Sequence, residues 1–222
     1  MKDKPRLVLF DLDHTLLAGD SDVLWCEFLM DKGLLDRGQF AARNADMEAR
    51  YKAGTVGAHE FAGFYVSTLQ GHTPASLEAI RQEFLRDAIV PRIPAKAIAL
   101  VESHRGDLAV MTTATNRYIT ELTAAHFGIE HLLATECEMQ EGRFTGRPEG
   151  TLNMREGKVT RLHAWLRARG LALQDTASTA YSDSINDLPL LQAVDDAVAV
   201  DPDARLDAEA QARGWRVLRL QR

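Results

Sequence analysis

Short apolar runs alternate with helical patterns along most of this chain. RLVLF (6–10) and LAVMT (108–112) are continuous apolar runs of the kind that form buried parallel strands. TAYSD (179–183), AVAV (197–200) and WRVLRL (215–220) are three weaker strand candidates. Between the strands, 116–128 and 158–170 have helical periodicity and end in glycine, as helices often do. This alternation predicts an α/β fold with a doubly wound parallel sheet.

One interval is too long for a single crossover between neighbouring strands. The distance from Asp11 to Thr112 far exceeds the roughly 30 residues of a strand–helix–strand unit. Residues 20–88 are helical in pattern almost throughout and are divided by Gly33, Gly54 and Gly71. We therefore expect a helical insertion at 19–88 and a core built from 1–18 and 89–222. Glycines in 138–150 predict a β-hairpin within that core.

Composition limits the classes of partner. The chain has 222 residues, is 45% hydrophobic and carries a formal net charge of −6, so nucleic acid is not an expected partner. No run approaches the ~20 apolar residues of a membrane helix, and the first apolar run is too short for a signal peptide. The two cysteines lie far apart in no metal or redox pattern. We expect a cytoplasmic protein with reduced thiols and no membrane partner, and no pattern indicates an oligomeric state.

Polar residues cluster where the predicted strands end. In open α/β sheets the ligand crevice lies at these carboxyl ends. Carboxylates there form a hard oxygen site suited to Mg²⁺, whereas a lysine, hydroxyls and helix N-termini suit phosphate. A metal beside a phosphate pocket leaves one carboxylate available as a nucleophile. The clustered residues are Asp11, Asp13, Thr15, Thr112, Thr113, Lys158, Asp183, Asn186 and Asp187.

These clusters resemble the four motifs of the haloacid dehalogenase (HAD) superfamily. DLDHT (11–15) matches the DxDxT motif, and VMT supplies the second-motif hydroxyl at Thr112. REGKV supplies the lysine of the third motif, and SDSIND (182–187) matches the fourth. The resemblance covers essentially the whole chain and implies a HAD-like Rossmannoid core with a type C1 helical cap at the insertion. The most similar branch is subfamily IB, which includes phosphoserine phosphatase.

The resemblance implies a phosphomonoester phosphatase (a phosphoric monoester hydrolase) that works through an aspartyl phosphate. Asp11 would attack phosphorus. Asp13 would protonate the leaving alcohol and then activate water, and two close carboxylates suit this division because their proton affinities differ. Mg²⁺ would be held by Asp11, the backbone carbonyl of Asp13, and Asp183.

The remaining motif residues would bind the phosphoryl group or support those that do. The resemblance implies that the Thr112 hydroxyl and the Thr113 amide bind phosphoryl oxygens, while Lys158 neutralises them. Asp187 would position Lys158 or a metal-bound water. Thr15 and Asn186 would support the site from behind. His14 is given no role, since its expected direction is away from the two acids; a place at the border of the pocket is the alternative.

The substrate prediction depends on the cap. In phosphoserine phosphatases an acid nine positions after the nucleophile meets the substrate amine, and Asp20 has that spacing here, with Asp22 nearby. The matching cap segment (60–71) contains no Arg or Lys for a substrate carboxylate. This favours a small amine-bearing phosphomonoester without a carboxylate, such as histidinol phosphate or phosphoethanolamine, with phosphoserine as the alternative. Asp20 could instead only cap the helix that follows.

Two other classes of protein share parts of this pattern. A phospho-accepting regulatory protein also combines acids, a threonine and a lysine on a parallel sheet. A catalytically dead binding protein on the same fold would keep the shape without the chemistry. The insertion and the pair of acids on one strand argue against the first, and the occupied motif positions argue against the second.

Overall fold

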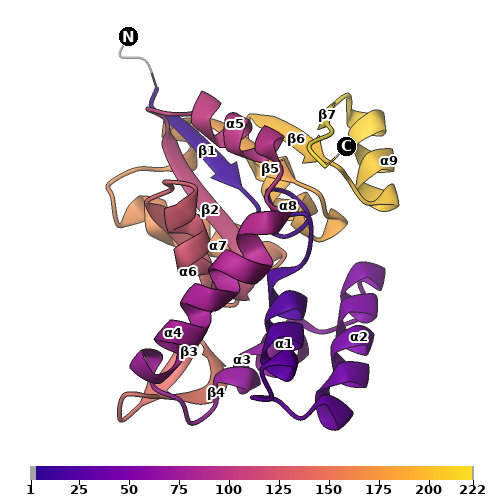
Figure 1. Cartoon of the computed structure of the whole chain (residues 1–222). Helices are drawn as coiled ribbons and strands as arrows, with labels where there is room; N and C mark the ends of the chain where they lie inside the picture. Colours follow the sequence, from indigo (N-terminus) through magenta and orange to yellow (C-terminus); the bar gives the residue numbers. More distant parts are fainter. Residues whose placement is uncertain (1–3, 222) are drawn as a thin grey trace.

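The computed structural model describes residues 4–221, so the ends of the predicted core range, 1–3 and 222, lie outside the described residues. Its strands form one seven-stranded sheet of order β4-β3-β2-β1-β5-β6-β7 (Figure 1). Every neighbouring pair is parallel except β3 and β4. The strands are β1 (Arg6–Phe10), β2 (Leu108–Asn116), β3 (His131–Gln140), β4 (Arg143–Glu149), β5 (Ala177–Ser182), β6 (Asp196–Val200) and β7 (Arg216–Leu218).

Helices cover both faces of this sheet, which confirms the predicted doubly wound α/β fold. On one face, Leu7 and Leu9 of β1 pack with α7 (Glu156–Arg167), α8 (Leu188–Ala193) and α9 (Ala204–Arg213). On the other face, Val8 and Phe10 pack with α5 (Ala95–Ser103) and α6 (Arg117–His126). Side chains of a strand alternate between its two faces, so a continuous apolar run fills both layers of the core.

Ahead of α5, four α-helices lie between β1 and β2, where the sequence predicts an insertion. They are α1 (Ser21–Asp31), α2 (Arg37–Ala53), α3 (Ala58–Val66) and α4 (Pro74–Phe84). Figure 1 shows α1 and α2 below the sheet and α4 running back toward it. A π-helical segment, Leu85–Ile89, continues α4 toward the core. We call this region the cap; its limits at residues 19 and 88 stay a prediction.

Local sequence explains where the cap helices begin and end. Asp36 starts α2 by accepting a hydrogen bond from the Gln39 amide at 2.8 Å. Gly54 ends the same helix in the left-handed conformation (φ 72°), which glycine adopts without steric cost. Thr73 and Ser76 form a reciprocal capping box at the start of α4.

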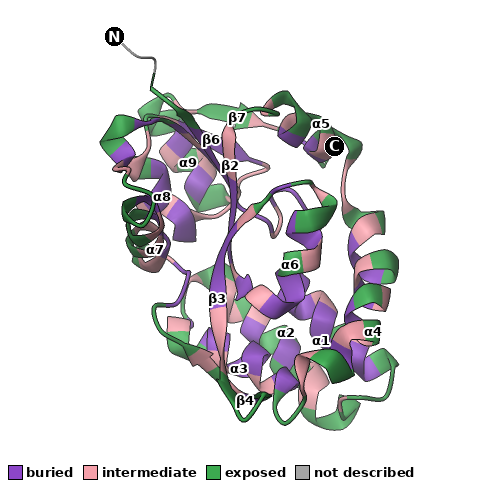
Figure 2. Cartoon of the chain, turned by 90° about the vertical axis from the view of Figure 1, so that its left-hand side faces the viewer, coloured by how far each residue is buried: buried purple, intermediate pink, exposed green. Residues whose placement is uncertain are grey.

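The two edge strands differ from their sequence predictions. The hairpin at 138–150 exists, but β3 begins at His131, so one ten-residue strand pairs parallel with β2 and then antiparallel with β4. At the other edge, β7 spans only Arg216–Leu218 and is shorter than the apolar pattern suggests. Figure 2 shows the contrast between the buried length of β2 and the more exposed β4.

Candidate active site

The carboxyl ends of the three adjacent strands β2, β1 and β5 lie side by side at one edge of the sheet. Phe10 of β1 lies beside Met111 of β2 and Tyr181 of β5. The residues that follow them, Asp11, Thr112 and Ser182, therefore continue the same row. Side-chain alternation directs all three toward the face covered by α7 and α8. Motifs far apart in the sequence are thus adjacent because the strands are in parallel register.

Lys158, on the first turn of α7, connects two of the predicted acids. Its Nζ lies 2.7 Å from Asp11 Oδ1 and 2.6 Å from Asp187 Oδ2, and all three side chains are buried. Burial raises the pKa of Asp11 to about 7, and Lys158 opposes that rise. Burial alone would lower the pKa of Lys158, but Asp11 and Asp187 raise it above its usual value. The lysine is therefore a fixed cation behind the Asp11 carboxylate.

Thr15 joins Asp11 to Asp183. Its hydroxyl lies 2.9 Å from Asp11 Oδ2 and 3.2 Å from Asp183 Oδ1, and it accepts a hydrogen bond from the Asp183 amide at 3.0 Å. Burial and the nearby Asp11 charge raise the pKa of Asp183 well above its usual range. Two carboxylates therefore share one hydroxyl in a region of excess negative charge.

The Asp13 carboxylate is held in place by three hydrogen bonds. It accepts from the Ser21 amide at 2.7 Å and from the Thr113 and Thr115 hydroxyls at 3.1 Å each. These donors come from the start of α1 and the end of β2, so Asp13 links cap and core. Ser21 and Thr115 are contacts that the motif analysis missed, because a serine in a helix first turn and a threonine on a strand carry no signal by themselves.

The predicted phosphate-binding threonines are buried at the end of β2. The Thr112 hydroxyl accepts a hydrogen bond at 3.0 Å from Asn153 Nδ2, which also lies 2.9 Å from the Thr113 carbonyl oxygen. Asn153 is fully buried and was not identified from the sequence. The Thr113 hydroxyl donates to Asp13, so its side chain holds the acid, and phosphate binding by Thr112 and Thr113 stays a prediction.

A small cavity lies over the acids and is covered by the cap. Its volume is about 20 Å³, and Tyr51 and Phe61 of the cap line it together with the aspartates. Such a volume holds about one water molecule, so a phosphomonoester enters only if the cap moves away. The described residues that line it, besides the two aromatics, are Asp11, Asp13, His14, Asp20, Ala114, Thr115, Asp183, Ser184 and Asp187.

His14 corrects one expectation from the sequence. It lines the same cavity as Asp11 and Asp13 instead of facing away from them. The simple alternation of strand side chains fails here because the chain has left β1 and His14 has a positive φ of 58°. Burial lowers the pKa of His14, and its Nε2 atom is buried without a hydrogen-bond partner.

The two cap acids predicted to face the substrate occupy different environments. Asp20 lines the cavity and also caps α1, with Oδ1 accepting from the Asp22 and Val23 amides at 3.0 Å each. Asp22 is not among the described residues that line the cavity; its Oδ2 lies 3.0 Å from the Thr115 hydroxyl, so Asp22 and Asp13 share that single donor. A substrate contact by Asp22 therefore has no support from the cavity lining and stays a prediction.

Asn186 and Arg155 join the core to the cap. Asn186 Nδ2 donates to the Tyr51 carbonyl oxygen at 3.4 Å, and Asn186 Oδ1 accepts from Arg155 Nε at 3.3 Å. Arg155 Nη2 also reaches the Val56 carbonyl oxygen at 3.3 Å. Asn186 thus holds the cap loop near the acids, and Arg155, which no motif indicates, acts with it.

This combination of fold and site defines a hydrolase of phosphoric monoesters. The family model described as haloacid dehalogenase-like hydrolase matches residues 8–192, and the chain belongs to this family. It is 40% identical over 217 residues to a histidinol-phosphatase of Neisseria meningitidis serogroup C (strain 8013), covering 96% of this chain and 98% of the relative.

Two solved structures place the fold in the same group. A protein of unknown function from Bordetella pertussis Tohama I superposes with a TM-score of 0.92 at 47% identity, covering 98% of this chain and 99% of the other. A phospho-aspartyl intermediate analogue of phosphoserine phosphatase superposes with a TM-score of 0.69 at 16% identity, covering 99% and 95%. The second likeness shows a shared fold. Both agree with the HAD-like core and helical cap that the sequence predicts.

Among residues 4–221, no helix combines the length and apolar character needed to cross a bilayer. The cytoplasmic location stays a prediction.

Proposed function

We propose that this chain is a Mg²⁺-dependent phosphatase of a small phosphomonoester that carries an amine and lacks a carboxylate, of the histidinol phosphate or phosphoethanolamine type. The observation that carries the proposal is the lining of the cavity over Asp11. It contains five aspartates and two aromatic rings, and no Arg or Lys is among the described residues that line it. An ammonium group is the natural partner of that surface.

Asp11 is suited to the role of nucleophile. Lys158 and Thr15 hold its two carboxylate oxygens from behind, at 2.7 and 2.9 Å, so the side chain has one fixed orientation. An Asp11 oxygen would attack phosphorus, and the bond from phosphorus to the ester oxygen would break. The product of this step is an aspartyl phosphate.

Asp13 is suited to moving the proton. The three hydrogen bonds from Ser21, Thr113 and Thr115 fix its carboxyl group beside the cavity. It would give a proton to the leaving alcohol, and the resulting carboxylate would then take a proton from the water that hydrolyses the aspartyl phosphate. The water oxygen ends on inorganic phosphate and Asp11 is regenerated.

The donor set fits a magnesium ion. Asp11 and Asp183 offer carboxylate oxygens, and the Asp13 carbonyl would supply a third, which is the hard oxygen chemistry that Mg²⁺ prefers. Within residues 4–221 no group of three His, Cys, Asp or Glu side chains is arranged to hold a metal ion, so the proposed site depends on two carboxylates and a backbone carbonyl. Burial, and then the neighbouring carboxylates, raise the pKa values of Asp11 and Asp183, and a bound cation would favour their ionised forms. When bound, the ion would neutralise charge on the phosphoryl group and orient it.

The cap side of the cavity supports the substrate class. The rings of Tyr51 and Phe61 lie 4.6 Å apart at 30° to one another, and aromatic faces attract both cations and flat rings. Asp20 offers a carboxylate nearby. None of the basic residues of α2 is among the described residues that line the cavity, and Arg50, next to Tyr51, is bound to Glu60 at the surface, at 2.6 Å. A phosphoserine carboxylate would therefore meet acids without a matching cation, which disfavours this alternative. The histidinol-phosphatase relative supports the same choice.

A phosphate-release assay tests the proposal. Histidinol phosphate, phosphoethanolamine, phosphoserine and glycerol phosphate would be compared with Mg²⁺ and after chelation, with Asp11→Asn as the control for contaminating activity. We expect turnover of the amine esters that needs Mg²⁺ and is absent in the variant. Preference for phosphoserine would refute the substrate class, and full activity after chelation would refute the cofactor. Absence of hydrolysis of any ester would favour a binding protein on the same fold.

A further inference from the structure

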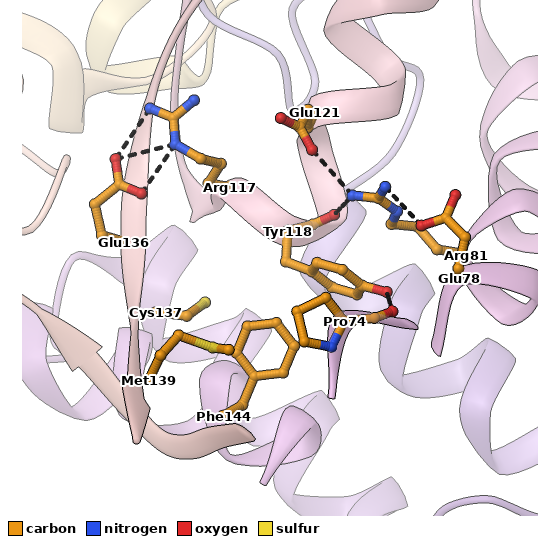
Figure 3. A pocket seen from close by; sticks show the side chains of 10 residues that line it. All are labelled: Pro74, Glu78, Arg81, Arg117, Tyr118, Glu121, Glu136, Cys137, Met139 and Phe144. Carbon is orange, nitrogen blue, oxygen red and sulfur yellow. Dashed lines mark hydrogen bonds and ion pairs between the residues drawn. The ribbon is translucent and has the colours of Figure 1, made fainter. Parts of the chain in front are cut away.

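A second pocket lies away from the active-site aspartates, between α4, α6 and the β3–β4 hairpin (Figure 3). Its volume is about 320 Å³, within the range of small-ligand sites in proteins. None of the residues that line the cavity over Asp11 takes part in it. Nothing in the proposed phosphatase chemistry uses this pocket.

The wall of the pocket is aromatic and apolar. Tyr118 of α6 and Phe144 of β4 meet edge to face, with ring centroids 5.0 Å apart, and Cys137 and Met139 of β3 continue the surface. The Tyr118 hydroxyl donates to the Pro74 carbonyl oxygen at 2.8 Å, so its polar end is satisfied. Met139 is 41% exposed, an unusual position for a large apolar side chain. Burial of an apolar ligand group against this wall would be favourable, because it removes apolar surface from water.

Arg81 supplies a buried cation with unused capacity. It donates to the Tyr118 carbonyl oxygen at 3.0 Å, to Glu121 at 3.1 Å and to Glu78 at 2.7 Å. Its guanidinium carbon lies 4.5 Å from the Tyr118 ring centroid. The residue is 9% exposed, yet its Nε atom is buried with no hydrogen-bond partner. An unpaired buried donor is costly, and a small shift of the Arg81 side chain toward the pocket would let a ligand oxygen accept from it.

The charges around the pocket balance. Arg117, on the other side, is bound to Glu136, which Arg161 also neutralises at 2.8 Å. Glu121 is bound only to Arg81, and its side chain is 57% exposed, so it can accept a second cation. Ligands with several phosphates are disfavoured because the carboxylates would repel them. Polycations are disfavoured because the guanidinium groups would repel them.

We propose that this pocket binds a small zwitterion with an apolar or aromatic side chain, of the free amino-acid class. The carboxylate would pair with Arg81, the ammonium group with Glu121, and the side chain would lie on Tyr118 and Phe144. These groups come from both the cap helix α4 and the core helix α6. A bound ligand therefore adds contacts across the junction that the cap must move over to admit substrate, and it lowers turnover.

L-Phenylalanine is a suitable probe, with phenethylamine and 3-phenylpropionate as analogues that each lack one charge. Calorimetry on the full chain should show saturable binding of the amino acid at one site. Losing one charge-assisted hydrogen bond should weaken the analogues by about ten- to a hundredfold. Equal affinity for all three probes, or no binding of L-phenylalanine at about 10 mM, would overturn the proposal.

Variants locate the binding site. Cys137→Phe fills the pocket and should abolish binding, while the exposed Glu121→Gln should weaken it by about tenfold and retain the fold. Glu130→Gln, an exposed acid outside the pocket, is the matched control and should change nothing. Unchanged binding in both pocket variants would place the amino acid elsewhere and refute the site.

The effect on the cap has its own readout. With whichever ester the enzyme turns over, L-phenylalanine should lower kcat without raising KM in the wild type, and should have no such effect in Cys137→Phe. A rise in KM alone would indicate competition at the active site. Unchanged kinetics at saturating L-phenylalanine would refute the coupling to the cap. This kinetic result does not depend on the calorimetric measurement, which tests binding alone.

Discussion

Asp20→Asn separates the two roles that the structure gives to one side chain. Asp20 caps α1 through Oδ1, which accepts two backbone hydrogen bonds at 3.0 Å, and it lines the cavity over Asp11. Asparagine is as good an N-cap residue as aspartate, because its side-chain oxygen accepts the same bonds. The substitution therefore keeps the start of the helix and removes only the charge.

The expected effect on selectivity follows from the contact that is lost. A hydrogen bond to a charged group contributes about 1.5–3 kcal/mol, which corresponds to about a ten- to hundredfold loss in kcat/KM. Esters with an ammonium group should show this loss. An ester without an amine should change by less than about threefold, because it never met the Asp20 charge.

The effect on stability has a definite sign. Burial, reinforced by Asp13, raises the pKa of Asp20 to about 8, above the usual value near 3.8. The folded state holds the Asp20 proton more tightly than the unfolded state does. Ionisation of Asp20 therefore lowers the free energy of unfolding. That cost grows as the pH rises from about 4 and is complete above about 8. Asp20→Asn should therefore be at least as stable as the wild type at pH 8.5, with the advantage lost near pH 4.

Paired kinetic and thermal measurements check both expectations. kcat/KM would be measured at pH 8.5, where Asp20 carries its charge, for histidinol phosphate, phosphoethanolamine and glycerol phosphate, and Tm would be measured by calorimetry at pH 8.5 and pH 4. Asp36→Asn is the matched control, because Asp36 caps α2 in the same way but is exposed and far from the aspartates. Equal losses for all three esters would reduce Asp20 to a helix-capping residue. A large fall in Tm would show that the substitution does more than remove a charge.

The other predictions concern the acids around Lys158. Asp11→Asn should abolish turnover with Tm little changed, since the amide still accepts from Lys158; activity within tenfold of wild type would exclude Asp11 as nucleophile. Mg²⁺ affinity should increase as the pH rises through about 7, because burial raises the pKa of Asp11 to about 7 and also raises that of Asp183, and each metal ligand must lose its proton; a flat calorimetric pH profile would contradict this. Asp183→Ala should weaken Mg²⁺ binding more than Asp187→Ala, whose carboxylate instead accepts from Lys158 and Ser182 at 2.6 and 2.8 Å; equal affinities would reverse this assignment.

The sequence could predict those parts of the site that depend on strand register. Asp11, Lys158 and Asp187 each follow a strand or begin a helix, and parallel register brings such positions together whatever the loops between them do. The four cap helices were equally readable, because glycines and polar N-cap residues mark their ends.

The contacts that depend on how separate elements pack could not be read in this way. Asn153 and Thr115 are ordinary polar residues whose partners are set by how two elements pack, and no spacing indicates that packing. Asp22 shows the same limit within one helix: it is two positions from Asp20, yet it is bonded to Thr115 and is not among the described residues that line the cavity. The closing of the cavity by Tyr51 likewise depends on where α2 lies in space.

The two edge strands of the sheet have a consequence for how copies of this protein can meet. β4 carries Pro148, which has no amide hydrogen to donate, together with Arg143 and Arg147. β7 is only three residues long, and Arg216 at its start is paired with Asp196. Short, charged or proline-bearing edges are poor templates for an incoming strand. Neither edge of the sheet therefore favours pairing with a strand of a neighbouring molecule. Because edge-to-edge pairing is the most direct way for a native sheet to form fibres, this protein should resist such aggregation when it is concentrated.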